Sequence, residues 1–169
     1  MISLSQLNTF TLEQFTETFG EIFENSPHIA QKAALARPFV SLEQAFDTMK
    51  DIVSASSIEE KTTLILEHPE LGKRIAMSNA SVQEQAGSGL NALTPEEFKK
   101  MSSLNTQYME KFKFPFIIAV TGLNKHDIMQ AIERRLAFDY ETEFTTALQE
   151  INKIAHIRFT ALTAEQATV

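Results

Sequence analysis

The chain has no cysteine, and only five glycines and five prolines occur among its 169 residues. Without cysteine, disulfide bonds, thiolate zinc sites and cysteine nucleophiles are excluded, and the composition suits a reducing cytosol. The sequence has no apolar stretch approaching the length of a membrane span, and no basic segment followed by an apolar run opens it. The C-terminal Ala167-Thr168-Val169 is not a peroxisomal address, so we expect a cytoplasmic protein.

Positive charge is also scarce. Fifteen basic residues stand against twenty-two acidic ones, which gives a net charge of −7. The basic residues are scattered and form no stripe, so nucleic acid is not an expected partner. A negatively charged substrate would need a local positive site.

The few glycines and prolines do not form a linker. Gly87-Ser88-Gly89 is too short to separate two domains, and no internal repeat or low-complexity tract divides the chain. We therefore predict a single domain over residues 1–169. The Gly-Ser-Gly is not a phosphate-binding loop, because no Lys-Ser or Lys-Thr follows it, and the sequence has no nucleophile elbow of the serine hydrolases.

Helix start signals are frequent in the first half. Thr11, Ser41 and Ser57 are each followed three residues later by glutamine or glutamate, a pattern typical of a helix N-terminus. Ser26-Pro27 predicts an N-cap and a first-turn proline for another helix, which Arg37-Pro38 should end. Apolar residues recur at helical spacing in these segments, and we interpret them as core: Phe15, Phe19, Ile22, Phe23, Leu42, Ala45, Phe46, Met49 and Val53.

The second half adds three helices and one irregular stretch. Thr94-Pro95 begins a helix that should reach about Lys111, Asn124 begins the next, and a long helix ends the chain. Residues 113–120 form a short apolar run without a partner strand, so we predict an extended buried segment whose backbone groups could face a polar ligand. The predicted fold class is all-α, a compact helical bundle with one irregular buried segment at residues 113–123.

A histidine stands at the end of one predicted helix. His68 has Leu64, Ile65 and Leu71 at helical spacing, so the imidazole should share their buried face. Pro69 disfavours helix at the residue before it, which places His68 at or just past the helix C-terminus. A histidine alone in such a place is usually a cap or a satisfied core group.

Glu84 and Arg158 are the other two candidates for chemistry. The helical neighbours of Glu84 are all small, which leaves room for a ligand beside the carboxylate. Arg158 lies on the apolar stripe of the last helix, and none of its helical neighbours can pair with a guanidinium. It is either half of a buried ion pair or a fork for a carboxylate or ureido oxygen, and Glu84 could serve both interpretations.

The remaining histidines give little sign of a metal site. His28 and His126 have no metal-ligand spacing to a carboxylate, and His156 lies two residues before Arg158, so on a helix the two point to different faces. We interpret all three as structural or surface residues. The charged Glu59, Glu60 and Lys61 stand at an ordinary helix start and should be solvated.

Four motifs occur in a characteristic order: HPELG from His68, SVQEQAGSGL from Ser81, KFKFPFI from Lys111 and KIAHIRF from Lys153. Together they closely resemble the family of 2-oxo-4-hydroxy-4-carboxy-5-ureidoimidazoline decarboxylases, the enzymes that complete the ureide pathway from urate to allantoin. The resemblance covers about residues 5–162. It implies a lyase that forms (S)-allantoin and carbon dioxide without a cofactor or a metal, since the substrate is its own electron sink. Family members are commonly dimers, so it also implies that a homodimer can form.

The resemblance also implies roles for particular residues. His68 would be the general acid that delivers a proton to one face of the substrate, and Glu84 and Arg158 would orient the ureido and carboxylate groups. Further residues would line the site or contact the substrate: Pro69, Ser81, Val82, Gln83, Gln85, Phe116, Ile117, Ile118, Ala119 and Val120.

Two other classes of function remain open. An inactive relative could serve as a helical binding module, although the presence of His68, Glu84 and Arg158 argues against it. A hydrolase could place a metal between His68 and Glu84, but one histidine and one carboxylate are a poor ligand set.

Overall fold

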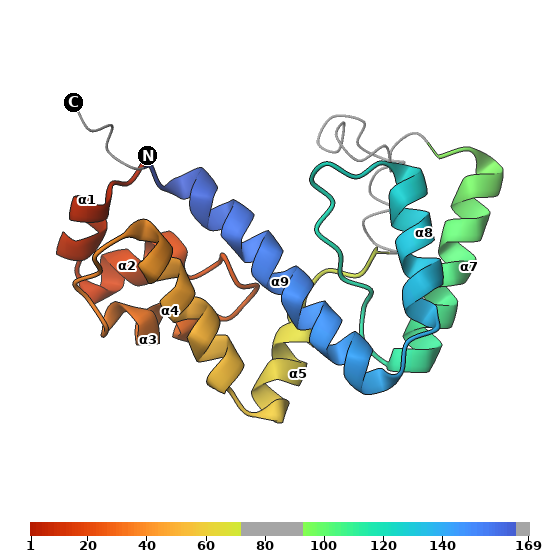
Figure 1. Ribbon diagram of the computed structural model, residues 1–169, viewed down its shortest axis with the longest axis horizontal. Helices are drawn as coiled ribbons and strands as arrows, with labels where there is room; N and C mark the ends of the chain where they lie inside the picture. Colours follow the sequence, from red (N-terminus) through yellow and green to blue (C-terminus); the bar gives the residue numbers. More distant parts are fainter. Residues whose placement is uncertain (72–92, 165–169) are drawn as a thin grey trace. The chain divides into compact units, whose positions relative to one another are not determined.

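The computed structural model describes residues 1–71 and 93–164, and the helices within these ranges are labelled in Figure 1. In these ranges the only β-type pairing is an isolated parallel bridge between Ile2 and Thr163. The predicted all-α class is confirmed for the part of the chain that is described. The helices are α1 (Leu4–Thr9), α2 (Leu12–Phe19), α3 (Pro27–Ala34), α4 (Leu42–Ala55), α5 (Ile58–Glu67), α7 (Pro95–Phe112), α8 (Lys125–Leu136) and α9 (Tyr140–Leu162).

The chain groups into two compact units. The first comprises residues 1–67 and 152–169, and the second comprises residues 68–151. The single domain expected over residues 1–169 stays a prediction. No helix in the described ranges is long and apolar enough to cross a membrane.

Most helix starts of the first unit follow the predicted capping patterns. The Thr11 hydroxyl accepts the Gln14 N–H, and the Gln14 side chain accepts the Thr11 N–H, so the capping box at α2 is complete. The Ser41 hydroxyl likewise accepts the Gln44 N–H at the start of α4. The Gln44 side-chain oxygen, however, accepts the N–H of Val40 and not that of Ser41, so this capping box is incomplete. Ser57 accepts the N–H of the third helical residue at the start of α5.

The predicted cap at α3 is wrong in one respect. Pro27 is the first helical residue, as expected, but the Ser26 hydroxyl donates to the carbonyl oxygen of Glu24 at 2.9 Å and caps no helix N–H. The fixed φ of proline already suits the first helical turn, and proline has no N–H to satisfy there. The helix can therefore start without a side-chain cap.

Phenylalanines form the core of the first unit, as their helical spacing predicted. Phe19 lies between two other rings, with its ring centroid 4.9 Å from that of Phe15 and 5.3 Å from that of Phe159 on α9. Phe46 on α4 packs against the same Phe159 ring at 5.6 Å. Such buried rings each contribute roughly 3–5 kcal/mol when measured by truncation to alanine.

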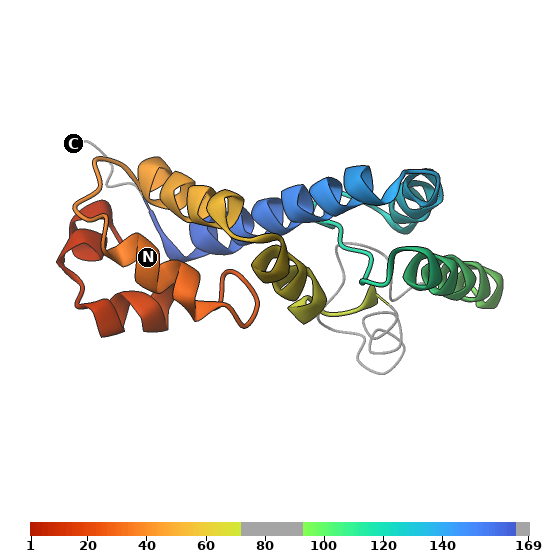
Figure 2. The same cartoon turned by 90° about the horizontal axis from the view of Figure 1, so that it is seen from below.

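In the second unit, α7 and α8 lie side by side and run in the same direction (Figures 1 and 2). At their N-terminal ends, Lys125 Nζ of α8 lies 2.8 Å from Glu97 Oε1 of α7. At their C-terminal ends, Lys111 Nζ of α7 donates to the carbonyl oxygens of Leu136 and Phe138, at 2.6 and 2.9 Å. The N-terminus of α7 thus lies beside the N-terminus of α8, and the two C-termini also lie together. The chain that leaves α7 after Phe112 must therefore run back along the helices to reach the start of α8 at Lys125.

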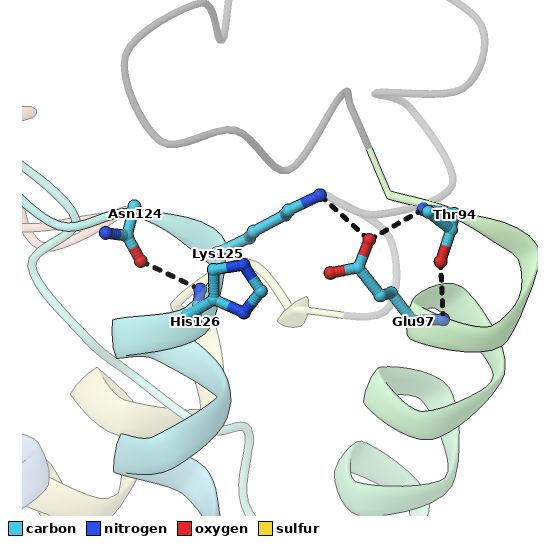
Figure 3. Close-up of polar contacts among 5 residues, drawn as sticks. All are labelled: Thr94, Glu97, Asn124, Lys125 and His126. Carbon is cyan, nitrogen blue, oxygen red and sulfur yellow. Dashed lines mark hydrogen bonds and ion pairs between the residues drawn. The ribbon is translucent and has the colours of Figure 1, made fainter.

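The contacts at the two N-terminal ends are drawn in Figure 3. Glu97 completes a capping box with Thr94, while Asn124 caps α8 by accepting the N–H groups of His126 and Asp127. The Lys125 ammonium and the Thr94 backbone N–H both favour the charged carboxylate, and they lower the pKa of Glu97 to about 2. The ion pair therefore ties the capped starts of two neighbouring helices together.

Residues 113–124 form this return and include the predicted irregular segment. An extended chain of this length spans about 40 Å, whereas a helix would span roughly 18 Å, less than the ~27 Å of the 18-residue α7. Lys113 takes the left-handed conformation that commonly ends a helix, with φ of 62°. Near the other end, Gly122 has φ of 79° in a turn closed by the Leu123 N–H and the Val120 carbonyl. The extended conformation thus follows from the parallel packing of α7 and α8.

Candidate active site

His68 directly follows the last residue of α5, as predicted. The residue is only 6% exposed, and Leu64, Ile65 and Leu71 are buried as well. The next residue, Pro69, is exposed. The structure therefore confirms a histidine on a buried face at a helix end, which is a place where competing protonation by bulk water is restricted.

Five of the candidate site residues, Ser81, Val82, Gln83, Glu84 and Gln85, lie outside the described residues. The small-residue surroundings predicted for Glu84 lie outside them too.

The segment from Phe116 to Val120 has the character that the sequence predicted. Phe116, Ile117 and Ile118 are buried, while Ala119 and Val120 are half-buried. Within the described ranges, no backbone or side-chain acceptor is recorded for the N–H groups of these five residues. Buried backbone N–H groups need partners, and none of the described residues supplies one for this stretch.

A buried polar cluster supports this segment, and the sequence reasoning missed it. Glu143 Oε1 of α9 accepts from Tyr108 Oη of α7 at 2.5 Å and from Arg135 Nε of α8 at 2.8 Å. Arg135 Nη2 lies 2.5 Å from the same oxygen, and its Nη1 donates to the carbonyl oxygen of Ile117 at 2.7 Å. Arg135, Glu143 and Tyr108 are all buried. We call these three residues the polar cluster.

The electrostatics of the polar cluster favour a charged pair and a neutral phenol. Arg135 and Glu143 compensate each other's charge out of water, which a lone buried ion could not do. Burial, and next the hydrogen bond to the Glu143 carboxylate, raise the pKa of the Tyr108 phenol well above its usual range. A sign of the cluster was available in the sequence, since Arg135 follows the apolar Ile132 by three residues and Glu143 precedes the apolar Ala147 by four.

Arg158 lies on the C-terminal part of α9, in the first unit, and its partner is Glu24. Its Nη2 lies 2.5 Å from Glu24 Oε1, and its Nη1 faces the carbonyl oxygens of Glu21 and Ile22 at 3.4 and 3.3 Å. An ion pair with an acidic residue was one of the two interpretations left open, but the Arg158 side chain is 36% exposed, so the expectation that the pair is buried is wrong. It lies on the same helix as the buried Ala155 and Phe159, and a long arginine side chain can reach water from the edge of such a face.

The other histidines lie on the surface, as interpreted from the sequence. His28, His126 and His156 are exposed, and the ring of His156 packs edge-on against Phe46 at 4.9 Å between centroids. In residues 1–71 and 93–164, no group of three or more metal-ligating side chains comes together.

Two solved structures resemble this chain in fold. The crystal structure of (S)-allantoin synthase superposes with a TM-score of 0.78 at 27% identity, over 96% of this chain and 54% of that one. An OHCU decarboxylase crystallised in the presence of (S)-allantoin matches with a TM-score of 0.68 at 20% identity, over 90% of this chain and 98% of that one, which shows the same fold.

The family follows from the sequence comparisons. The OHCU decarboxylase family model matches residues 8–160, and this chain belongs to that family. The 2-oxo-4-hydroxy-4-carboxy-5-ureidoimidazoline decarboxylase of Haloferax volcanii is 40% identical over 157 residues, covering 93% of this chain and 94% of that protein. A uric acid degradation bifunctional protein of Bacillus subtilis is 42% identical over 166 residues, which cover 98% of this chain. The chain spans 34% of that Bacillus protein's length.

Proposed function

We propose that this chain decarboxylates 2-oxo-4-hydroxy-4-carboxy-5-ureidoimidazoline to (S)-allantoin and carbon dioxide, as a step of urate degradation. The observation that carries the proposal is the buried histidine directly after α5, in a chain that matches the OHCU decarboxylase model over residues 8–160. The inactive binding module is the alternative, and a turnover assay separates the two.

The substrate itself can accept the electron pair that decarboxylation leaves behind. When the bond to the carboxylate carbon breaks, its electron pair forms a double bond to the neighbouring ureido-bearing carbon, and the imine nitrogen of the ring takes a proton. The resulting enol then becomes a ring carbonyl: its hydroxyl loses a proton, and the ureido-bearing carbon gains one. Carbon dioxide is the only group lost, so the balance needs no oxidant, reductant or cofactor.

In this proposal the protein controls where the last proton arrives. His68 delivers it to one face of the ureido-bearing carbon, and general acid catalysis of this kind is typically worth about 10²–10⁴-fold in rate. The burial of His68 supports the role, because water that is kept away from the enol cannot protonate the opposite face.

Other residues would hold the substrate in one orientation. Arg158 is suited to a carboxylate or ureido oxygen because its flat guanidinium can donate two parallel hydrogen bonds, and Glu24 restrains that group. Glu84 would bind the ureido group. The remaining contacts are proposed for Pro69, Ser81, Val82, Gln83, Gln85 and the backbone of residues 116–120.

The setting of the enzyme is also a proposal. The lack of cysteine supports the cytoplasm as its location, and the family resemblance supports a homodimer. Light scattering of the purified chain would measure its oligomeric state directly.

Freshly prepared intermediate tests the activity itself. The purified protein should accelerate carbon dioxide release well beyond the spontaneous rate, in proportion to enzyme concentration and in the presence of a strong chelator. Release at the spontaneous rate would contradict the decarboxylase and favour the binding module. Consumption of the intermediate without additional carbon dioxide, lost in the chelator and restored by added metal, would favour the metal-dependent hydrolase instead.

A further inference from the structure

We propose that Arg135 is a positioning residue, which turns the peptide group between Ile117 and Ile118 so that the Ile118 N–H can donate to an oxygen of the substrate. The proposal rests on the function proposed above. It assigns to the polar cluster a task beyond stability, namely to set the direction of a backbone donor in the segment from Phe116 to Val120.

Arg135 contacts two consecutive residues of the segment, Phe116 and Ile117. Its Nη1 donates to the Ile117 carbonyl oxygen at 2.7 Å, and its guanidinium carbon lies 4.3 Å from the centroid of the Phe116 ring. A guanidinium stacked on an aromatic face and bonded at its edge has little freedom to rotate. The carbonyl of Ile117 is therefore held towards α8.

The second step is the closed set of contacts around Arg135. Glu143 fixes its Nε side at 2.8 Å, and Tyr108 Oη holds the same carboxylate oxygen at 2.5 Å. The Tyr108 ring then packs edge-on against Phe116, with 5.1 Å between centroids. Tyr108, Glu143, Arg135 and Phe116 thus form a closed ring of contacts. Through this ring the position of Phe116 depends on side chains from α7, α8 and α9.

The third step concerns the geometry of the peptide group. In a planar trans peptide, the carbonyl of one residue and the N–H of the next point in opposite directions. Because the Ile117 carbonyl points to Arg135, the Ile118 N–H points away from Arg135. None of the residues in the described ranges is recorded as accepting that N–H. A carbonyl or carboxylate oxygen of a ureidoimidazoline is a suitable acceptor for it.

Arg135→Lys tests the proposal, with Arg134→Lys as the matched control on the exposed side of the same helix. An ammonium cannot bond Glu143 and the Ile117 carbonyl in one plane while it stacks on Phe116. We expect kcat/KM to fall about 10- to 100-fold, mainly through a higher KM, since a hydrogen bond to the substrate is misdirected. Amide hydrogen exchange in residues 116–120 should become faster. The control should change neither quantity.

A second pair of variants keeps the test decisive if Arg135→Lys does not fold. Tyr108→Phe removes one hydroxyl from the polar cluster, and Tyr140→Phe removes an exposed one. Exchange in residues 116–120 should rise in the first variant only, with a smaller rise in KM.

A direct readout is the amide signal of Ile118 in protein labelled with ¹⁵N-isoleucine. Addition of (S)-allantoin should shift this signal in the wild type, and the shift should shrink in Arg135→Lys. If the variants lose only thermal stability, while KM, exchange and the allantoin shift stay unchanged, Arg135 is merely structural and the proposal is wrong. If the wild type does not turn over the intermediate, the proposed function fails, and the exchange data still decide whether Arg135 orders the segment.

Discussion

Removal of one oxygen atom from the polar cluster should measurably destabilise the protein. Tyr108→Phe keeps the ring that packs on Phe116 but deletes the hydroxyl that donates to Glu143 Oε1 at 2.5 Å. A hydrogen bond to a charged group contributes about 1.5–3 kcal/mol. Glu143 keeps its bond from Arg135, and the variant no longer buries a hydroxyl, so we expect a loss at or below the lower end of this range, about 1–2 kcal/mol.

Thermal unfolding followed by circular dichroism would measure this loss. For a chain of 169 residues, a loss of 1 kcal/mol lowers Tm by roughly 2–4 °C, so Tyr108→Phe should unfold about 2–8 °C below the wild type. Tyr140, the other tyrosine, is 50% exposed, and Tyr140→Phe should stay within about 0.5 kcal/mol of the wild type. Equal Tm values for the two variants would refute the reasoning about the polar cluster.

The same phenol should report on alkaline pH. The raised pKa of Tyr108 means that the folded state keeps a proton that the unfolded state loses above about pH 10. Its contribution to stability is therefore fully present below pH 10 and declines as the pH rises further. An absorbance titration should show one phenol that resists ionisation until the chain unfolds, and Tyr108→Phe should lack that phase.

Three further outcomes are expected. The pKa of Glu97 is lowered from 4.5 to about 2 in the folded state, so the stability that its carboxylate contributes is present above pH 4.5 and is lost as the pH falls from there to about 2. Acid unfolding of Glu97→Gln should lack this loss of stability, whereas Glu96→Gln should keep it. Arg158→Lys should weaken (S)-allantoin binding, measured by calorimetry; a lower Tm with unchanged affinity would make its pair with Glu24 purely structural. His68→Asn should cost about 10²–10⁴-fold in kcat while circular dichroism stays native, and His156→Asn, at an exposed position, should keep full activity.

The parts of the fold that the sequence predicted are those with local causes. Thr11, Thr94 and Asn124 begin helices because each side chain bonds to N–H groups two or three residues ahead, which spacing alone reveals. His68 follows a helix end because Pro69 excludes helical backbone before it. The extended character of residues 113–120 was predictable from composition, but its cause, the parallel course of α7 and α8, was not.

The interactions that the sequence did not predict join distant residues. Arg158 reaches Glu24 across 134 positions, and Tyr108 reaches Glu143 across 35. A charged residue on an apolar helical face signals that a partner exists, but many acidic residues could supply it. The choice depends on how the helices pack, which periodicity within one helix does not encode. For the same reason, the partial exposure of Arg158 could not be read from its place on the apolar stripe.

The most direct test of the central claim is the stereochemistry of allantoin made from fresh intermediate in D₂O. In water alone, the planar enol takes a proton on either face and gives racemic product, whereas in the proposed mechanism the buried His68 delivers a proton to one face only. We expect a single enantiomer, (S)-allantoin, with one solvent deuterium at the ureido-bearing carbon, and a lower enantiomeric excess in Glu84→Gln. Racemic allantoin from the wild-type protein would contradict it, whatever the rate at which the intermediate disappears.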